Sequence, residues 1–195
     1  MPPLLVSTAH RFVFLHVPKT GGSSIRASLL PFSDPGQYVM GEDRPVKDPS
    51  RSTHRSTHAT VKQWDGSRRV EWEGKRLMGV YRNPWDRVAS AWAFHRRQGN
   101  TWAPSSFVTF VKGKMKNHHN NKMTRPQTHW LTHCHTVLMF DHLVEDFAAW
   151  CEIIGIAPAP LPHLLDSGAK WDDIQTPETR AIIADYYAEE IDRWA

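Results

Sequence analysis

A strand, a glycine loop and a helix follow one another directly in the first thirty residues, and this order restricts the fold more than any other feature of the chain. Residues 12–17 form a β-branched and aromatic run that a proline ends, which is typical of a buried strand. Residues 19–22 are the loop. From Ser23 the apolar residues have helical spacing as far as Pro31, with Ser23 or Ser24 available as the helix cap. The sequence therefore predicts a strand–loop–helix unit.

The middle of the chain repeats this alternation. Residues 77–81 are a second candidate for a buried strand, and Asn83 and Pro84 after it are a strong helix start that predicts a helix as far as Gly99. Residues 137–140 predict a third short strand, and residues 143–154 predict the helix that follows it.

A last helix is expected after Thr176, where Thr-Pro-Glu is a typical helix start. Its predicted apolar face consists of Ile182, Ile183, Tyr186, Tyr187 and Ile191. Strands that alternate with helices predict an α/β fold, a P-loop-like three-layer domain with a mostly parallel central sheet flanked by helices. Because 195 residues are the length of one domain, we expect residues 1–195 to form a single domain.

Two segments lack a clear pattern of either kind. Residues 31–55 hold four prolines, two glycines and scattered charges, so we expect an irregular surface loop that binds substrate. Residues 112–125 are basic and rich in histidine and asparagine, which indicates mobility. The second segment is either an ordinary solvated loop or a rim that binds an anionic acceptor.

The glycine loop has the parts of an anion-binding site. Its glycines let backbone N–H groups converge, the helix after it offers its positive end, and Lys19 and the serine hydroxyls add donors. In the Walker A loop of ATP- and GTP-binding proteins the lysine follows the glycines, whereas Lys19 precedes Gly21 and Gly22. An ATP or GTP loop of the usual kind is therefore disfavoured, and a plain turn before a capped helix is the remaining alternative.

A second constellation follows the second predicted strand. The sequence VYRNPWDRVASAW places Arg82 at the strand end and Ser90 about two helical turns later, roughly 10 Å along the helix axis and still within reach of the arginine. Together these side chains could hold a second phosphate. The alternative is an ion pair between Arg82 and Asp86, with Ser90 as an incidental small residue on a packed face.

Both segments resemble the sulfotransferases that use 3′-phosphoadenosine 5′-phosphosulfate (PAPS). FLHVPKTGGSSI looks like their loop for the 5′-phosphosulfate, and VYRNPWDRVASAW looks like their 3′-phosphate-binding segment. The form that the two motifs take in this chain is similar to their form in the heparan sulfate 2-O-sulfotransferase-like and bacterial carbohydrate sulfotransferase branch. Further segments resemble that branch, namely STHATVKQW and LMFDHLVEDFAAWCEIIGI with the LPHLLDS after it, so the resemblance touches most of the chain.

The resemblance implies a role for each residue of the two segments. Lys19 would neutralise the bridging oxygen of the leaving phosphate, while Arg82 and Ser90 would hold the 3′-phosphate of PAPS and of its product 3′-phosphoadenosine 5′-phosphate (PAP). The 5′ end would be bound by the loop residues Lys19, Thr20, Gly21, Gly22, Ser23 and Ser24. In-line sulfuryl transfer depends on positioning and electrostatic stabilisation, and that scheme requires no metal. Gln127 and Lys170 are further candidates for contacts with the cofactor.

A base must take the proton from the acceptor hydroxyl, and histidine suits this task because its pKa lies near neutrality. The resemblance favours His58, whose segment lies beside the sulfate in relatives, and the alternative is a surface or packing histidine. His54 with His58, and His129 with His133, have the i, i+4 spacing of zinc ligands. HRSTH lacks the glutamate of HExxH, however, and the chain has no CxxC pair, so no metal site is expected.

Charge and composition limit the partners. The formal net charge is +4 with 12 histidines uncounted, and the pI is about 9.2, which favours anionic partners. No window approaches the ~18 apolar residues of a membrane span, and the N-terminus lacks a signal-peptide pattern. The two cysteines, Cys134 and Cys151, form no disulfide framework and indicate a reducing compartment. We therefore expect a soluble, cytoplasmic protein without a membrane span.

The leading hypothesis is a PAPS-dependent sulfotransferase that acts on a hydroxyl of a carbohydrate acceptor. One alternative is a non-catalytic module of the same fold that binds PAPS or an anionic glycan. Another is a P-loop kinase, which the order of lysine and glycines disfavours. Nucleic-acid binding is not expected, because the basic residues form no recognisable module.

Overall fold

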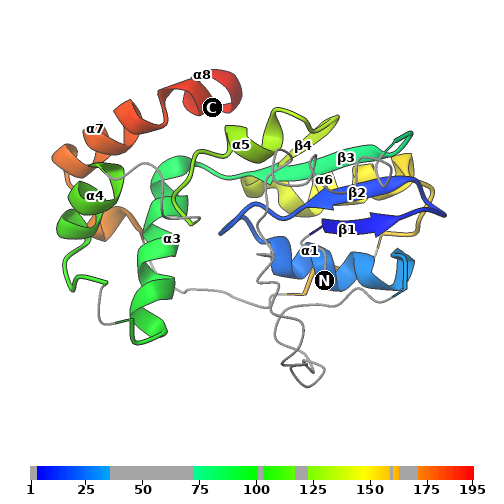
Figure 1. Ribbon diagram of the computed structural model, residues 1–195, viewed down its shortest axis with the longest axis horizontal. Coiled ribbons are helices and arrows are strands. Elements are labelled where there is room, and N and C mark those ends of the chain that lie inside the picture. The colour runs from blue at the N-terminus through cyan, green and yellow to red at the C-terminus, as the bar shows by residue number, and fades with distance from the viewer. Residues whose placement is uncertain (1–3, 36–72, 101–102, 117–122, 159, 163–170) are drawn as a thin grey trace, which may run out of the picture.

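The computed structural model describes residues 4–35, 73–100, 103–116, 123–158, 160–162 and 171–195 and contains a four-stranded sheet, which forms one half of the molecule (Figure 1). Its strands, in spatial order, are β1 (Leu4–Ser7), β2 (Phe12–Leu15), β3 (Arg76–Tyr81) and β4 (Thr136–Met139). β2, β3 and β4 run parallel, and β1 pairs antiparallel with β2 at the edge. The predicted α/β fold with a mostly parallel sheet is confirmed, although β1 was not anticipated.

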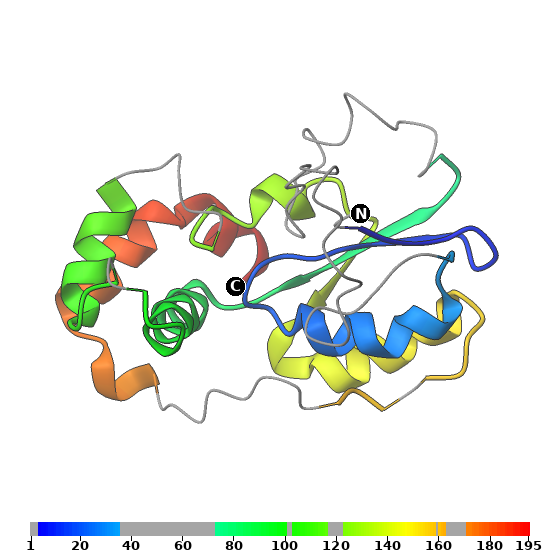
Figure 2. The same cartoon turned by 60° about the horizontal axis from the view of Figure 1, so that its bottom comes forward.

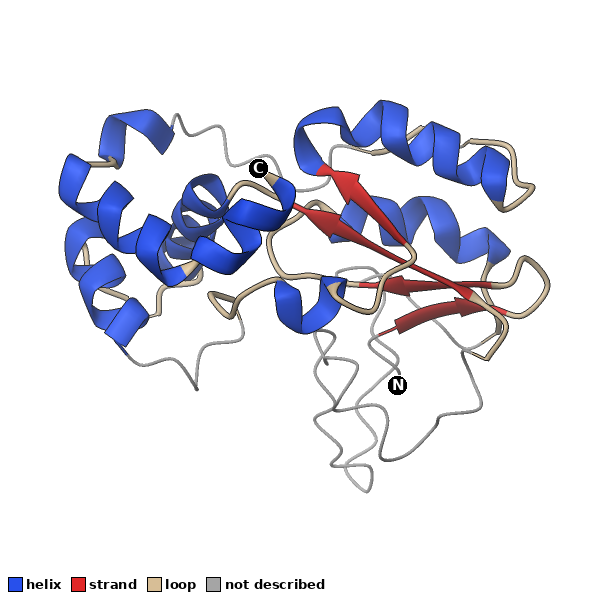
Figure 3. Ribbon diagram, turned by 90° about the horizontal axis from the view of Figure 1, so that it is seen from above, coloured by secondary structure: helices blue, strands red, loops and turns tan. Residues whose placement is uncertain are grey.

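Helices cover both faces of this sheet and extend beyond one of its ends. The helical elements are α1 (Gly22–Leu29), η1 (Leu30–Phe32), α3 (Pro84–Arg97), α4 (Phe107–Lys116), α5 (Thr128–Leu131), η3 (Phe140–His142), α6 (Leu143–Ile153), η4 (Trp171–Ile174), α7 (Pro177–Tyr186) and α8 (Ala188–Trp194). α1 and α6 lie on one face and α5 on the other (Figures 2 and 3). α3, α4, α7 and α8 gather beyond the carboxyl ends of the parallel strands. Among the described residues, no helix combines the length and the apolar character that crossing a membrane requires.

Strand β2 is apolar on both sides because both faces of the sheet are covered. Phe12 and Phe14 pack into the core that α1 and α6 close, whereas Val13 and Leu15 belong to a separate apolar cluster. All four side chains are fully buried. Strands of a parallel sheet covered on both faces are near-continuous apolar runs, which is why the sequence FVFL identified this strand.

A second core joins the helices beyond the strand ends. It packs Val88 and Ala89 of α3 against Phe110 and Val111 of α4 and Ile183 of α7, all buried. The helical half therefore has an apolar interior of its own and meets the sheet half where β2 and β3 end (Figure 1).

Two predicted helix starts are confirmed by their capping contacts. The Asn83 side chain accepts a hydrogen bond from the backbone N–H of Trp85 at 3.0 Å and so caps α3. Thr176 and Thr179 form a capping box at the start of α7. The predicted stop of α6 is also confirmed, since Gly155 follows it with a φ of 71°.

The predicted serine cap of the first helix is wrong. The N-cap of α1 is Gly21, with a φ of 75°, and no side chain caps this helix. Because the helix begins at Gly22, Ser23 and Ser24 lie inside its first turn. Their hydroxyls are therefore not used as the N-cap.

Two further expectations are corrected. The predicted last helix consists of two helices, α7 and α8, because Tyr187 leaves helical geometry with φ −109° and ψ 20°. The basic segment predicted as mobile over residues 112–125 begins inside α4, where the Lys112 ammonium pairs with Glu178 at 2.7 Å. Residues 117–122 lie outside the described residues. The irregular loop predicted over residues 31–55 starts with η1, and its residues 36–55 also lie outside them.

Candidate active site

The glycine loop turns twice through left-handed backbone before α1 begins. Lys19 and Gly21 have φ values of 67° and 75°. The hydroxyl of Thr20, which is fully buried, donates to the carbonyl of Val17 at 3.0 Å, and the backbone N–H of Ser24 donates to the carbonyl of Gly21 at 3.0 Å. Turns of this kind bring successive N–H groups to one concave side, which is the arrangement that binds phosphate and similar anions. The predicted strand–loop–helix unit is confirmed.

Lys19 has an unusual backbone for a residue with a side chain. Among the described residues, only it and Arg11 combine a side chain with a positive φ. Left-handed backbone costs such a residue about 1 kcal/mol, so the surroundings must hold it in place. One contact that does so is the hydrogen bond from Nη1 of Arg82 to the carbonyl of Lys19, at 3.2 Å.

Both glycines of the loop are closely packed at the position that a side chain would take. A Cβ on Gly22 would lie 2.1 Å from Cδ2 of His16, a buried residue whose ring stacks on that of Phe14. A Cβ on Gly21 would lie 3.1 Å from Cδ2 of Leu143, and positive φ disfavours a side chain there in any case. Close packing therefore favours glycine at both positions, and the positive φ favours it at Gly21 as well.

Arg82 joins the two segments that the sequence predicted to act together. It follows the last residue of β3, and its guanidinium carbon lies 4.1 Å from the centre of the Phe140 ring. Burial lowers the pKa of Arg82, and the negative charges of Asp86 and Asp141 oppose this shift. Its Nε is buried and makes no hydrogen bond to the described residues. A cationic side chain with a buried, unused donor is suited to bind an anion.

The ammonium group of Lys19 lies against α3. Its Nζ is 4.4 Å from the centre of the Phe94 ring. Burial lowers the pKa of Lys19 from 10.5 to about 8, and repulsion by Arg97 and Arg82 adds to this effect. Ser90, which is 7% exposed, precedes Phe94 by four residues and therefore lies on the same side of α3. Lys19, Arg82 and Ser90 thus come to one region at the carboxyl ends of β2 and β3, where α/β proteins usually bind ligands.

Not every predicted site residue can be located. His58, the predicted base, lies outside the described residues, as do His54 and Lys170. Within the ranges that the structure describes, no group of three or more histidine, cysteine or acidic side chains could hold a metal ion.

Cys134 and Cys151 are both free thiols, and burial raises the pKa of Cys134 to about 12 and that of Cys151 to about 11.

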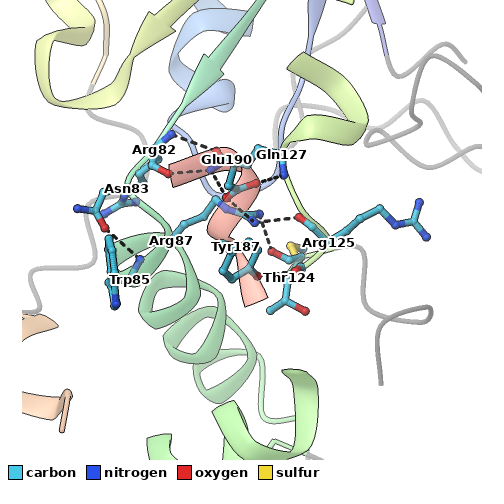
Figure 4. A network of polar contacts seen from close by, with 10 residues as sticks. Arg82, Asn83, Trp85, Arg87, Thr124, Arg125, Gln127, Tyr187 and Glu190 are labelled. Carbon is cyan, nitrogen blue, oxygen red and sulfur yellow. Dashed lines mark hydrogen bonds and ion pairs between the residues drawn. The ribbon is translucent and has the colours of Figure 1, made fainter. Parts of the chain in front are cut away.

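A buried polar network lies next to Arg82 (Figure 4). Arg87 donates through Nη1 to the carbonyl of Met123 at 3.1 Å and through Nη2 to the carbonyl of Arg125 at 2.8 Å. The same Nη2 lies 4.0 Å from Oε1 of Glu190, and both side chains are buried to 1% exposure or less. Burial raises the pKa of Glu190, while the charge of Arg87 and hydrogen bonds from Gln127 oppose this rise.

Sequence reasoning missed this network. Gln127 was expected to approach a cofactor, but it is fully buried, and its side chain bonds to the backbone of Arg82 and to Glu190 instead. One signal in the sequence could have indicated it. Glu190 lies three residues after Tyr187 and directly before Ile191, so an acidic residue adjoins the predicted apolar face of the last helix. That signal could not identify the partner, which lies 63 residues away in the chain.

Comparison with known proteins identifies the family of this chain. Residues 2–157 match the family described as the sulfotransferase family. Searches of curated proteins and of solved structures returned no match. The matched residues include the glycine loop, Arg82, Ser90 and Gln127, whereas α7 and α8 follow the matched region. On this match over most of its length, and with an α/β architecture consistent with that fold, the chain belongs to the sulfotransferase family.

Proposed function

We propose that the chain transfers a sulfuryl group from PAPS to a hydroxyl of a carbohydrate acceptor. The observation that carries this proposal is the contact between the two anion-binding elements, in which the guanidinium of Arg82 bonds to the left-handed loop at Lys19. One concave loop and one arginine from the neighbouring strand suit a ligand with anionic groups at two ends. PAPS has such groups, a 5′-phosphosulfate and a 3′-phosphate.

Each half of the site has a part in holding the donor. The loop from Lys19 to Ser24 binds the 5′-phosphosulfate end through backbone N–H groups and through the hydroxyls of Ser23 and Ser24, while the Thr20 hydroxyl stays bonded to the carbonyl of Val17. Arg82 and Ser90 bind the 3′-phosphate, for which the buried Nε of Arg82 supplies an unused donor.

Lys19 and His58 serve the chemical step. The acceptor oxygen attacks sulfur in line, a new S–O bond forms, and the bond from sulfur to the bridging oxygen of the donor breaks. The Lys19 ammonium neutralises the charge that develops on that bridging oxygen. His58 takes the proton of the acceptor hydroxyl. The contact of Lys19 with Phe94 is a weak cation–π interaction, which an anionic ligand can replace.

The test is transfer of ³⁵S from labelled PAPS to a panel of glycans and small alcohols, with PAP binding measured by calorimetry. We expect wild-type protein to label a glycan, and Lys19→Ala and His58→Ala to reduce labelling by at least about 100-fold. Absence of PAP binding by the wild-type protein would contradict the proposal. Tight PAP binding without transfer to any acceptor, by wild type as by His58→Ala, would instead support a binding module, and transfer that persists in His58→Ala would refute His58 as the base. Preference for a non-carbohydrate alcohol would refute the acceptor class, which rests on the resemblance of the motifs.

A further inference from the structure

The backbone of Arg82 is held on both sides by one side chain. Oε1 of Gln127 accepts a hydrogen bond from the N–H of Arg82 at 3.0 Å, and Nε2 of Gln127 donates to the carbonyl of Arg82 at 2.8 Å. A glutamine amide that pairs with both backbone groups of one residue fixes the position and the orientation of that peptide segment. Arg82 lies just beyond β3, where the ladder with β4 ends at Tyr81. Gln127 therefore replaces the strand neighbour that Arg82 lacks.

Glu190 of α8 in turn holds Gln127. Its Oε2 accepts from the backbone N–H of Gln127 at 2.5 Å, and its Oε1 accepts from Nε2 of the same residue at 2.9 Å. Gln127 and Glu190 are 0% and 1% exposed. Both carboxylate oxygens are thus used, and the charge of Arg87 lies 4.0 Å away. Such a fully bonded, buried arrangement is rigid, since any other orientation of Gln127 would leave a buried polar group unpaired.

The hydrogen bonds form a chain from the last helix to the glycine loop. Glu190 bonds to Gln127, and Gln127 bonds to both backbone groups of Arg82 (Figure 4). The guanidinium of Arg82 in turn bonds to the carbonyl of Lys19. The ring of Phe140 adds a second link, because it faces the guanidinium of Arg82 and lies 3.3 Å from where a Cβ on Gly21 would be.

We propose that Gln127 and Glu190 are positioning residues, which hold the backbone of Arg82 so that its guanidinium meets the 3′-phosphate of the donor. The proposal rests on the proposed function, in which Arg82 binds that phosphate. It also assigns a task to α8, which lies beyond the residues matched to the family. Helix α8 supplies the carboxylate that orders Gln127, and this carboxylate is hydrogen-bonded to Gln127 and not to Arg82.

The experiment compares two ligands that differ only in the 3′-phosphate, PAP and adenosine 5′-phosphate, by calorimetry on the full chain. Glu190→Gln keeps the shape of the side chain but places an amide donor beside the donors of Gln127 and Arg87. Gln127→Met keeps the volume and the backbone bond to Glu190 but removes both bonds to Arg82. For each variant we expect about fivefold weaker binding of PAP, and adenosine 5′-phosphate binding within about twofold of wild type.

Tyr187→Phe is the matched control. It removes another buried hydrogen bond next to α8, from the Tyr187 hydroxyl to the carbonyl of Thr124 at 2.5 Å, whereas every hydrogen bond of Gln127 and Arg82 is kept. We expect it to leave the preference for PAP unchanged. Equal losses for both ligands in Glu190→Gln and Gln127→Met, or an unchanged preference, would reduce the two residues to a general structural role and overturn the proposal.

Amide hydrogen exchange separates this proposal from the proposed function. If wild-type protein binds both ligands equally, the role of Arg82 at a 3′-phosphate is wrong, and exchange of the Arg82 N–H in ligand-free protein then decides whether the positioning exists. We expect that exchange to be about fivefold faster in Glu190→Gln, although residue 190 makes no hydrogen bond to Arg82, and unchanged in Tyr187→Phe. An Arg82 N–H that exchanges at the wild-type rate in Glu190→Gln would overturn the positioning itself.

Discussion

Lys19 combines a strained backbone with a poorly solvated charge. Its φ of 67° turns the loop, and its ammonium lies against the Phe94 ring and is repelled by the charges of Arg97 and Arg82. Burial is the largest cause of its lowered pKa, and the charges of Arg97 and Arg82 come next. Because an anionic ligand would offset both effects, protonation of Lys19 and binding of an anion favour each other.

We expect the affinity for PAP to fall as the pH rises through about 8. Lys19 is charged below that pKa and neutral above it, whereas a lysine with the usual pKa of 10.5 would keep its charge. The loss approaches about tenfold per pH unit above the pKa, and calorimetric titrations from about pH 7 upward measure it. Lys19→Arg keeps a positive charge throughout this range and should remove the fall. An equal fall in that variant would assign the titration to another group.

Gly22→Ala tests the packing of the loop on His16. The added Cβ would lie 2.1 Å from the imidazole ring, so we expect a loss of about 1–3 kcal/mol in the free energy of unfolding, measured by urea denaturation. Gly113→Ala is the control, because that helical glycine has nothing within 4 Å of its Cβ position and should gain up to about 1 kcal/mol. Adding His16→Ala to Gly22→Ala removes the imidazole ring that the new Cβ meets, so the double variant should regain part of the lost free energy of unfolding. A loss of equal size at Gly113 would contradict this explanation.

Among the elements, α3 connects the site to the helical core. Its N-terminus follows Arg82, its middle carries Ser90 and Phe94 on one side, and Val88 and Ala89 pack into the core with α4 and α7. The position of Ser90 relative to Arg82 therefore depends on where this helix begins. The Asn83 cap and the proline after it define that start.

Removal of that cap should lower stability by about 1 kcal/mol. Asn83→Ala leaves the N–H of Trp85 without the acceptor that Asn83 provides at 3.0 Å. Asn83→Ser keeps a side-chain acceptor and is expected to retain most of the stability. Both variants are compared by urea denaturation at constant pH. Equal stability of wild type and Asn83→Ala would show that the cap contributes nothing.

In the molecule as a whole, the C-terminal helices return to the place where the chain's two halves meet. Glu190 of α8 reaches Gln127, and Arg87 of α3 reaches the carbonyls of Met123 and Arg125, so segments far apart in the sequence share one buried polar cluster (Figure 4). Because the charges of this cluster are buried, its stability depends on their complete pairing.

Arg87→Met should destabilise the protein by about 3–5 kcal/mol at neutral pH, because it leaves the Glu190 carboxylate buried without its cation. Arg180→Met removes an exposed pair with Asp172 and should cost at most about 1 kcal/mol. The pKa of Glu190 is already raised in the folded protein, so acid protonates it there before it protonates an unfolded chain. The penalty of Arg87→Met should therefore shrink as the pH falls. Denaturation at several pH values tests this, and a constant penalty would contradict it.

Local patterns were sufficient to predict most elements. The run FVFL, the Asn83-Pro84 start and the Thr176 cap are recognisable because propensity and capping act within a few residues. The split at Tyr187 was not predictable in this way. Its hydroxyl and the carboxylate of Glu190 bond to Thr124 and Gln127, each 63 residues distant, and these contacts accompany the departure from helical geometry.

The amino-acid order alone indicated an anion-binding loop, since a lysine before two glycines at the end of a buried strand is a local arrangement that disfavours the usual nucleotide loop. It also indicated that Arg82 and Ser90 act with that loop. Only the folded chain showed that Arg82 bonds to the carbonyl of Lys19, that Phe94 faces the ammonium, and that Gln127 bonds both to the backbone of Arg82 and to Glu190. The physical reason is that the parallel sheet and the C-terminal helices bring together residues that are far apart in the chain. Neither periodicity nor spacing in the sequence indicates such pairs.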